Sequence, residues 1–248
     1  NMKLTEEVYL VGGGDYSFNL SHRLDVHVYI IKSGDDLAMI DAGFGPGTDE
    51  ILQNIANDGL DASKIKQIFI THYHADHAGG LAPMKRATGA KVVVPKEAAH
   101  TIRVADADQI GLNWAKRFGF YPKDYEWEPC EVDEEFQDGD RLRIGLLEME
   151  AIATPGHCEG HYCLLLRGND RSYLFSSDAV FWGGAVIVQN VPDVSVQDYA
   201  RSVAKLAEYD FDALLPGHHM ISMRNGKRHV QTALEGFDRI GLPKQLLG

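Results

Sequence analysis

The stretch "FITHYHADHAGG", Phe69 to Gly80, carries the densest set of candidate metal ligands in the chain. Three histidines and one aspartate fall within the six positions His72–His77, directly after the apolar, strand-like run 66–71. Alternate side chains of an extended segment share a side, so His72 and His74 are expected to point together. Asp76 and His77 then fall on a turn into the next helix, which directs them towards a second centre.

Three further candidate ligands stand at the ends of apolar runs, where loops on rigid strands usually carry function. They are His157 in "TPGHCEGH", Asp178 in "LFSSDA" and His218 in "LLPGHH". Together with the first cluster they make seven candidates, more than one ion can use, because a catalytic zinc takes about three protein ligands plus water. Two ions sharing one carboxylate can use them. Imidazole and carboxylate suit zinc, manganese or iron.

The pattern along the chain predicts an α/β fold in one domain, residues 1–248. Expected strands cover 7–11, 26–32, 37–43, 66–71, 91–95, 141–145, 147–155, 161–167, 172–179, 185–191 and 212–219. Expected helices cover 47–58, a segment ending near Gly89, 195–209 with Ser195 as the N-cap, and 227–240. Residues 96–127 are predicted to form a helical, aromatic-rich insertion.

Composition limits the class of partner. The 248 residues are 44% hydrophobic and carry a formal net charge of -12, which disfavours binding to nucleic acid or anionic membranes. No apolar run approaches the ~20 residues of a membrane span, and no basic-then-apolar signal pattern stands at the start. Three cysteines are too few for a disulfide framework, so a cytoplasmic location is expected.

In these features the chain resembles the metallo-β-lactamase superfamily of metal-dependent hydrolases. The motif HxHxDH is present at 72–77, followed in order by "TPGH", "SSDA" and "PGH", and the match runs from "MIDAG" to "PGHH". The resemblance implies an αββα sandwich with two metal ions at one edge of the packed sheets. It implies that His72, His74 and His157 hold one ion. It also implies that Asp76, His77 and His218 hold the other.

The same resemblance gives roles to two more carboxylates. Asp178 would bridge the two ions, and Asp41 in "IDAG" would support the site by orienting its ligands. The cofactors expected are two divalent ions, zinc first, with iron and manganese as alternatives. Asp76 would orient the attacking water or carry a proton to the leaving group.

Within the superfamily, the ligand set is similar to the lactonase and glyoxalase II-like branch. An acidic bridge and a full second site are typical of it, whereas His74 argues against the diiron flavoprotein branch. About thirty residues follow His218, fewer than the helical domain of glyoxalase II needs. Acyl-homoserine lactonases place a tyrosine where Phe181 stands. The expected substrate is a small ester, lactone or thioester; an iron-dependent persulfide dioxygenase, a phosphodiesterase or a β-lactamase stay open as alternatives.

Candidate substrate contacts come from the aromatic residues and from the histidine beside the last ligand. The insertion could roof the active site, or its aromatics could serve packing or a homodimer interface. His161 is expected to be structural and to bond a nearby backbone group. The residues proposed to line the substrate pocket are Tyr16, Phe18, Trp114, Phe118, Phe181 and His219.

Overall fold

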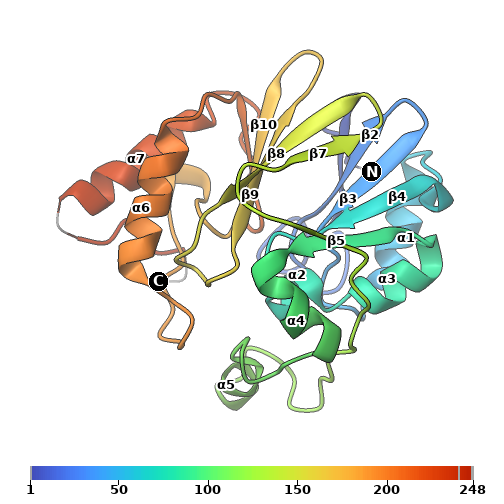
Figure 1. The fold of residues 1–248 in the computed structure, drawn as a ribbon, viewed down its shortest axis with the longest axis horizontal. Coiled ribbons are helices and arrows are strands. Elements are labelled where there is room, and N and C mark those ends of the chain that lie inside the picture. The colour runs from blue at the N-terminus through green and yellow to red at the C-terminus, as the bar shows by residue number, and fades with distance from the viewer. Residues whose placement is uncertain (1, 240, 247–248) are drawn as a thin grey trace. The chain divides into compact units, whose positions relative to one another are not determined.

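A computed structural model describes residues 2–239 and 241–246 of the chain. They divide into two compact units. The first unit runs to Phe136 and includes Ile144–Leu146, and the second comprises Gln137–Arg143 and the chain from Leu147 onward. Each unit contains one sheet (Figure 1).

The six-stranded sheet of the first unit has the order β1-β2-β3-β4-β5-β6. Its strands are β1 (Val8–Gly12), β2 (Val28–Ser33), β3 (Asp36–Ile40), β4 (Ile65–Phe69), β5 (Lys91–Pro95) and β6 (Glu134–Phe136). The pairs β1–β2 and β2–β3 are antiparallel, and β3 to β6 run parallel. Because β3 and β4 are parallel neighbours, their carboxyl ends meet at one edge, which brings Asp41 and the HxHxDH loop (His72–His77) together.

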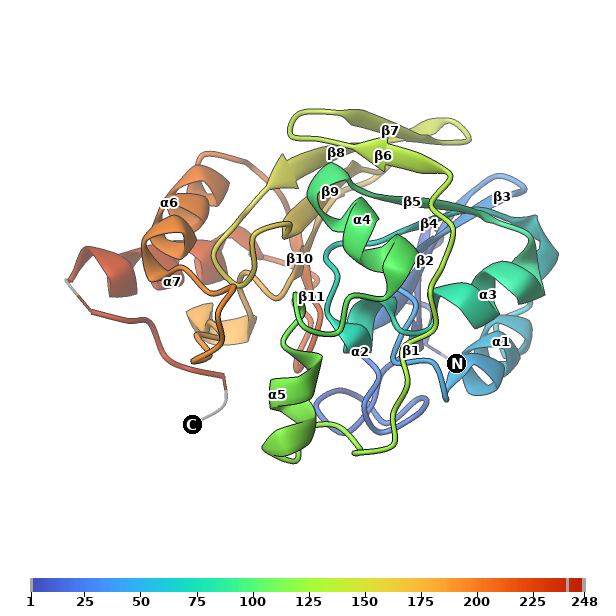
Figure 2. The same ribbon diagram turned by 60° about the horizontal axis from the view of Figure 1, so that its bottom comes forward.

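Short helices connect the strands of the first unit. They are α1 (Thr48–Asn57), the 3-10 turn Ala62–Lys64, α2 (Ala75–Ala78), α3 (Leu81–Thr88), α4 (Lys96–Val104) and α5 (Leu112–Arg117). In α1 the buried side chains Ile51 and Ile55 share one face, as their spacing predicts. Helix α3 ends at Gly89, whose left-handed φ of 71° suits a residue without a Cβ. Figure 2 shows α5 away from the sheet of its unit.

The five-stranded sheet of the second unit has the order β11-β10-β9-β8-β7. Its strands are β7 (Arg141–Ile144), β8 (Leu147–Ala153), β9 (Tyr162–Arg167), β10 (Ser172–Ser177) and β11 (Ala213–Pro216). Strands β8, β9 and β10 pair antiparallel, whereas β10 and β11 are parallel. The parallel pair places the residues that follow both strands, Asp178 and His218, at one edge of the sheet.

Helices α6 (Val196–Ala207) and α7 (Lys227–Asp238) cover the second unit, with the 3-10 turn Trp182–Gly184 before them. They pack side by side (Figure 1). Tyr199, Val203 and Leu206 of α6 pack into a buried cluster with Leu174 of β10 and Leu214 of β11. Ser195 caps α6 as predicted, since its Oγ accepts a hydrogen bond from the Asp198 N–H at 3.3 Å.

The predicted α/β class with two sheets is confirmed, but some local predictions are wrong. Residues 185–191 do not form a strand: Val186 makes only an isolated bridge to Gln245, and the apolar run is buried by packing instead. Strand β6 was missed because "EEF" is short and lacks alternation. Only parts of 96–127 are helical, and the expected helix end at residue 240 lies outside the described residues. None of the described helices is long and apolar enough to cross a membrane.

Candidate metal centre

Asp41 forms hydrogen bonds with the start of the HxHxDH loop and with one of its histidines. It is 2% exposed and adopts a left-handed φ of 59°, a conformation uncommon for a residue other than glycine. Its Oδ1 accepts hydrogen bonds from the Thr71 N–H at 2.9 Å and the Thr71 Oγ1 at 3.0 Å. Its Oδ2 lies 2.8 Å from Nδ1 of His77. The carboxylate therefore fixes both the start of the loop and one imidazole within it.

The ligand atoms of the loop have spacings that suit metal binding. Two atoms bound to one ion at about 2.1 Å lie roughly 3.0–3.8 Å apart for angles of about 90–130° at the ion. His72 Nε2 and His74 Nδ1 are 3.1 Å apart. His77 Nε2 and Asp76 Oδ2 are 3.7 Å apart, and Asp41 engages the other nitrogen of His77. The loop thus presents two pairs of ligand atoms, each able to share an ion.

The opposite oxygen of Asp76 is bound by a residue that the sequence did not single out as a site residue. Tyr121, in the insertion, donates its hydroxyl hydrogen to Asp76 Oδ1 at 2.8 Å. Burial first, and the charge of Asp76 second, raise the pKa of Tyr121 well above its usual range, so the phenol stays protonated and donates. Aromatic enrichment of 96–127 was the only sequence signal for this contact.

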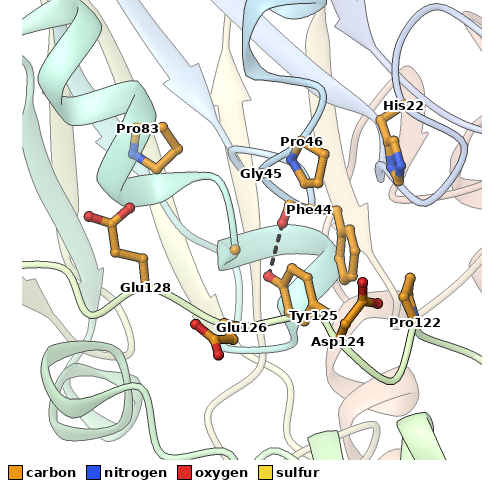
Figure 3. Close-up of a pocket in the computed structure, with 11 residues that line it drawn as sticks. His22, Phe44, Gly45, Pro46, Pro83, Pro122, Asp124, Tyr125, Glu126 and Glu128 are labelled. Carbon is orange, nitrogen blue, oxygen red and sulfur yellow. Dashed lines mark hydrogen bonds between the residues drawn. The ribbon is translucent and has the colours of Figure 1, made fainter.

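Tyr121 belongs to an aromatic cluster with Phe44 and Tyr125. The rings of Phe44 and Tyr125 stack with centroids 3.9 Å apart, and the Tyr125 hydroxyl donates to the Phe44 carbonyl at 2.9 Å (Figure 3). Phe44 and Tyr125 also line a cavity of about 450 Å³ together with His22, Pro122 and other residues. None of the seven predicted ligands lines this cavity, so it is distinct from the ligand set.

The second unit holds the remaining three candidate ligands, and one oxygen lies at their centre. Asp178 Oδ2 is 3.5 Å from His157 Nε2 and 3.7 Å from His218 Nε2. Both distances are too long for a good hydrogen bond but fit two ligand atoms of one ion. A single carboxylate oxygen that faces two imidazoles is compatible with one shared ion and also with a carboxylate that bridges two ions.

Two hydrogen bonds of the Asp178 backbone and one of its neighbour Ser177 hold this loop in place. Its backbone N–H donates to His161 Nε2 at 3.2 Å, so His161 bonds a backbone group as predicted. Its carbonyl accepts from the Tyr199 hydroxyl at 2.6 Å. Ser177 before it has a left-handed φ of 47° and accepts at its carbonyl from the Gly217 N–H at 2.8 Å, which ties the loops of Asp178 and His218 together.

The loop of His157 depends on a glycine that the sequence pattern "TPGH" contains. Gly156 has a φ of 141°, and a Cβ there would stand 2.4 Å from the Cα of Tyr199. The Ser195 N–H also donates to the Gly156 carbonyl at 2.9 Å. Close approach to the start of α6 therefore sets the path of the chain into His157.

The candidate substrate contacts are scattered over both units. Tyr16 and Phe18 are partly exposed, and Phe18 stacks on His27 with ring centroids 5.6 Å apart. The rings of Trp114 and Phe118 stack at 5.5 Å and remain exposed. A substrate role for all four stays a prediction.

The two candidates in the second unit flank the last ligand. Phe181 is fully buried beside Ala185 and Ile187, with its ring centroid 6.3 Å from that of His218. His219 is half-buried, and burial followed by the neighbouring His218 lowers its pKa. Their contact with substrate also stays a prediction.

The chemistry of the candidate ligand side chains suits metal binding. Within each unit, imidazole and carboxylate atoms lie at spacings that suit ligands: His72 with His74 and His77 with Asp76 in the first unit, and Asp178 with His157 and His218 in the second. His72, His77 and His157 are no more than 2% exposed, and buried imidazoles and carboxylates at these spacings suit zinc or iron. The donors therefore fit divalent ions of that type.

Comparison with known proteins shows the family of the chain. Residues 23–218 match the family model described as the metallo-beta-lactamase superfamily. The chain therefore belongs to the metallo-β-lactamase superfamily. It is 32% identical over 171 residues to a hydroxyacylglutathione hydrolase of Polaromonas sp., covering 68% of this chain and 54% of that protein. It is 23% identical over 233 residues to an atrochrysone carboxyl ACP thioesterase of Aspergillus fumigatus, covering 94% of this chain and 61% of that protein.

Solved structures share the fold. A subclass B3 metallo-beta-lactamase of Bradyrhizobium japonicum aligns with a TM-score of 0.73 and 25% identity, covering 96% of this chain and 92% of that chain. A beta-lactamase from Chitinophaga pinensis aligns with a TM-score of 0.72 at 20% identity, covering 96% and 91%. By contrast, the chain spans only about half to three fifths of the length of the first curated relatives, at 54%, 61% and 47%.

Proposed function

We propose that the protein is a dinuclear metal-dependent hydrolase that cleaves thioesters, with small esters and lactones as further substrates. The observation that carries the proposal is the single oxygen of Asp178 that faces both His157 Nε2 and His218 Nε2, at 3.5 and 3.7 Å. In this proposal two divalent ions, zinc first, would share Asp178 as a common ligand. His72, His74 and His157 would hold one ion, and Asp76, His77 and His218 would hold the other.

When bound, such ions lower the pKa of a shared water and polarise the carbonyl that it attacks. The chain's own residues supply orientation. Asp41 holds Nδ1 of His77 at 2.8 Å, which leaves Nε2 as the ligand nitrogen. Asp76 accepts the Tyr121 hydroxyl at Oδ1 and directs Oδ2 towards His77 Nε2; in this proposal the Asp76 carboxylate also orients the attacking water or carries a proton to the leaving group.

Thioesters rank first because of the relatives. They include a hydroxyacylglutathione hydrolase and an atrochrysone carboxyl ACP thioesterase, and a relative from Bos taurus, 24% identical over 211 residues, is an acyl-coenzyme A thioesterase. A thiolate leaves more readily than an alkoxide because a thiol is the stronger acid, so protonation of the leaving group matters less for a thioester than for an ester.

A second candidate function is β-lactam hydrolysis. The observation that favours it is the B3 metallo-beta-lactamase likeness, with a TM-score of 0.73 at 25% identity. An iron-dependent persulfide dioxygenase remains a further alternative, and it requires one iron in place of two ions.

Metal analysis combined with a substrate panel separates these functions. Purified protein would be assayed for zinc, iron and manganese per chain. It would then be offered an acyl-glutathione, an acyl-coenzyme A, a lactone, a phosphodiester, a persulfide and a chromogenic β-lactam. The proposal expects two zinc ions and turnover of a thioester. One iron with oxygen-dependent persulfide consumption, or turnover of the β-lactam alone, would reject it.

The proton role of Asp76 needs its own variant. Asp76→Ala is expected to lower ester and lactone turnover even in excess zinc, because an alkoxide leaving group depends more on protonation than a thiolate does. If Asp76→Ala retained both ions and full turnover, the proton and orienting roles would be wrong.

A further inference from the structure

The two oxygens of Asp76 face different partners. Oδ1 accepts the Tyr121 hydroxyl at 2.8 Å, and Oδ2 lies 3.7 Å from His77 Nε2. A carboxylate with two unrestrained oxygens can rotate or bind an ion through both. A hydrogen bond to one oxygen removes that freedom, and partners of this kind orient metal ligands.

The donor is itself held firmly. Tyr121 packs on Phe44 with ring centroids 4.9 Å apart and lies 6.2 Å from the ring of Tyr125. Tyr125 stacks on Phe44 and bonds its carbonyl, and the Phe44 N–H donates to Asp25 at 2.8 Å. The loop that follows β3 thus anchors the part of the insertion that carries Tyr121.

Close packing against α2 strengthens this anchor. A Cβ built on Gly79, at the end of α2, would stand 2.3 Å from the Tyr125 hydroxyl and 2.4 Å from the Phe44 carbonyl. Segment 121–125 therefore lies directly against the short helix that carries Asp76. The contact between Tyr121 and Asp76 is part of a packed interface within the first unit.

We propose that Tyr121 is a positioning residue for the metal ligand Asp76: its hydroxyl fixes Oδ1 and presents Oδ2 alone to the ion shared with His77. The inference rests on the proposed two-metal function. It gives the insertion a role separate from a lid or an interface, because one of its side chains controls how a ligand on α2 binds its ion.

Tyr121→Phe tests the inference, with Tyr125→Phe as the matched control. Each variant loses one hydroxyl from the same aromatic cluster, but only the first loses the bond to Asp76. Metal-depleted wild type and both variants would be titrated with zinc against a chromophoric chelator. The Co²⁺-loaded proteins would be compared by visible absorption, which reports ligand geometry, and thermal unfolding would check the fold.

Tyr121→Phe is expected to lower the affinity for one of the two ions about ten- to a hundredfold and to change the visible spectrum of the Co²⁺-loaded protein. Tyr125→Phe is expected to keep both ions and the wild-type spectrum. The inference is overturned if Tyr121→Phe binds two ions with wild-type affinity and spectrum, or if both variants lose metal equally. Wild type that binds a single ion would overturn the proposed function as well, so the two failures are distinguishable.

Discussion

Asp41 Oδ2 and His77 Nδ1 are 2.8 Å apart in a buried pair, and this contact engages Nδ1, so that Nε2 is the nitrogen that faces the candidate ligand Asp76. With the proton on Nδ1 shared with the carboxylate, Nε2 keeps its lone pair. The strained left-handed backbone of Asp41 is what directs the carboxylate to this position.

Asp41→Asn is expected to lower the affinity for the ion that His77 is proposed to bind about ten- to a hundredfold. An amide that donates to Nδ1 would move the proton of His77 to Nε2, the ligand nitrogen. Asparagine tolerates a left-handed φ, so the variant should fold. A chelator titration checks the affinity; unchanged binding of both ions would show that Asp41 does not set the tautomer.

Gly79→Ala is expected to destabilise the protein by about 1–3 kcal/mol, because the new Cβ would meet the Tyr125 hydroxyl and the Phe44 carbonyl. Its φ of -62° suits any residue, so backbone strain contributes little. Denaturant unfolding would measure the change. In a Tyr125→Phe background the cost should be smaller, and an equal cost in both backgrounds would place the clash elsewhere.

Because the three cysteines are buried, we expect the folded protein to react slowly with thiol reagents. All three are buried and none forms a disulfide; burial raises the pKa of Cys130 to about 11 and that of Cys163 to about 12. Labelling with a chromogenic disulfide at pH 8 should be slow until denaturant is added. Rapid labelling of native protein would show that the thiols are accessible.

The same shifts set a pH dependence of stability. A thiol whose pKa is higher in the folded than in the unfolded state stabilises the fold below the unfolded pKa, near 9 here. That contribution is lost as pH rises from about 9 towards the folded pKa. Unfolding by denaturant should therefore become easier over this range, and flat stability from pH 8 to 11 would contradict the burial of these groups.

Trp114→Ala and Phe118→Ala decide the role of the exposed stack on the insertion. If it roofs the active site, KM should rise for apolar acyl substrates and stay constant for small polar ones. Steady-state kinetics across acyl chain lengths makes the comparison. An unchanged KM, with a change in oligomeric state by light scattering, would instead identify an interface.

Much of the first unit could be predicted because its strands are short apolar runs bounded by glycines, and strand β4 leads directly into the HxHxDH loop. Residues 185–191 mimic such a run, yet Val186 is buried through packing and a single bridge. Apolar patterning reports burial, and it reports a strand only where a pairing partner exists.

The candidate ligand residues could be named from motif order, whereas the contact of Tyr121 with Asp76 could not be foreseen. The two residues are 45 positions apart, and the segment that carries Tyr121 has no periodic pattern to fix its direction. The path of that segment depends on stacking against Phe44, a tertiary contact. Local sequence therefore identified the candidate ligands, but not the tyrosine that donates a hydrogen bond to one of them.

The most direct test of the central claim is zinc stoichiometry and thioester turnover in wild type, Asp178→Ala and His100→Ala. His100 is an exposed histidine outside the ligand set and controls for adventitious binding. The account predicts two zinc ions per chain and turnover in wild type and His100→Ala. It predicts at most one tightly bound ion and at least about a hundredfold slower turnover in Asp178→Ala. Two tightly bound ions and full turnover without the Asp178 carboxylate would contradict it.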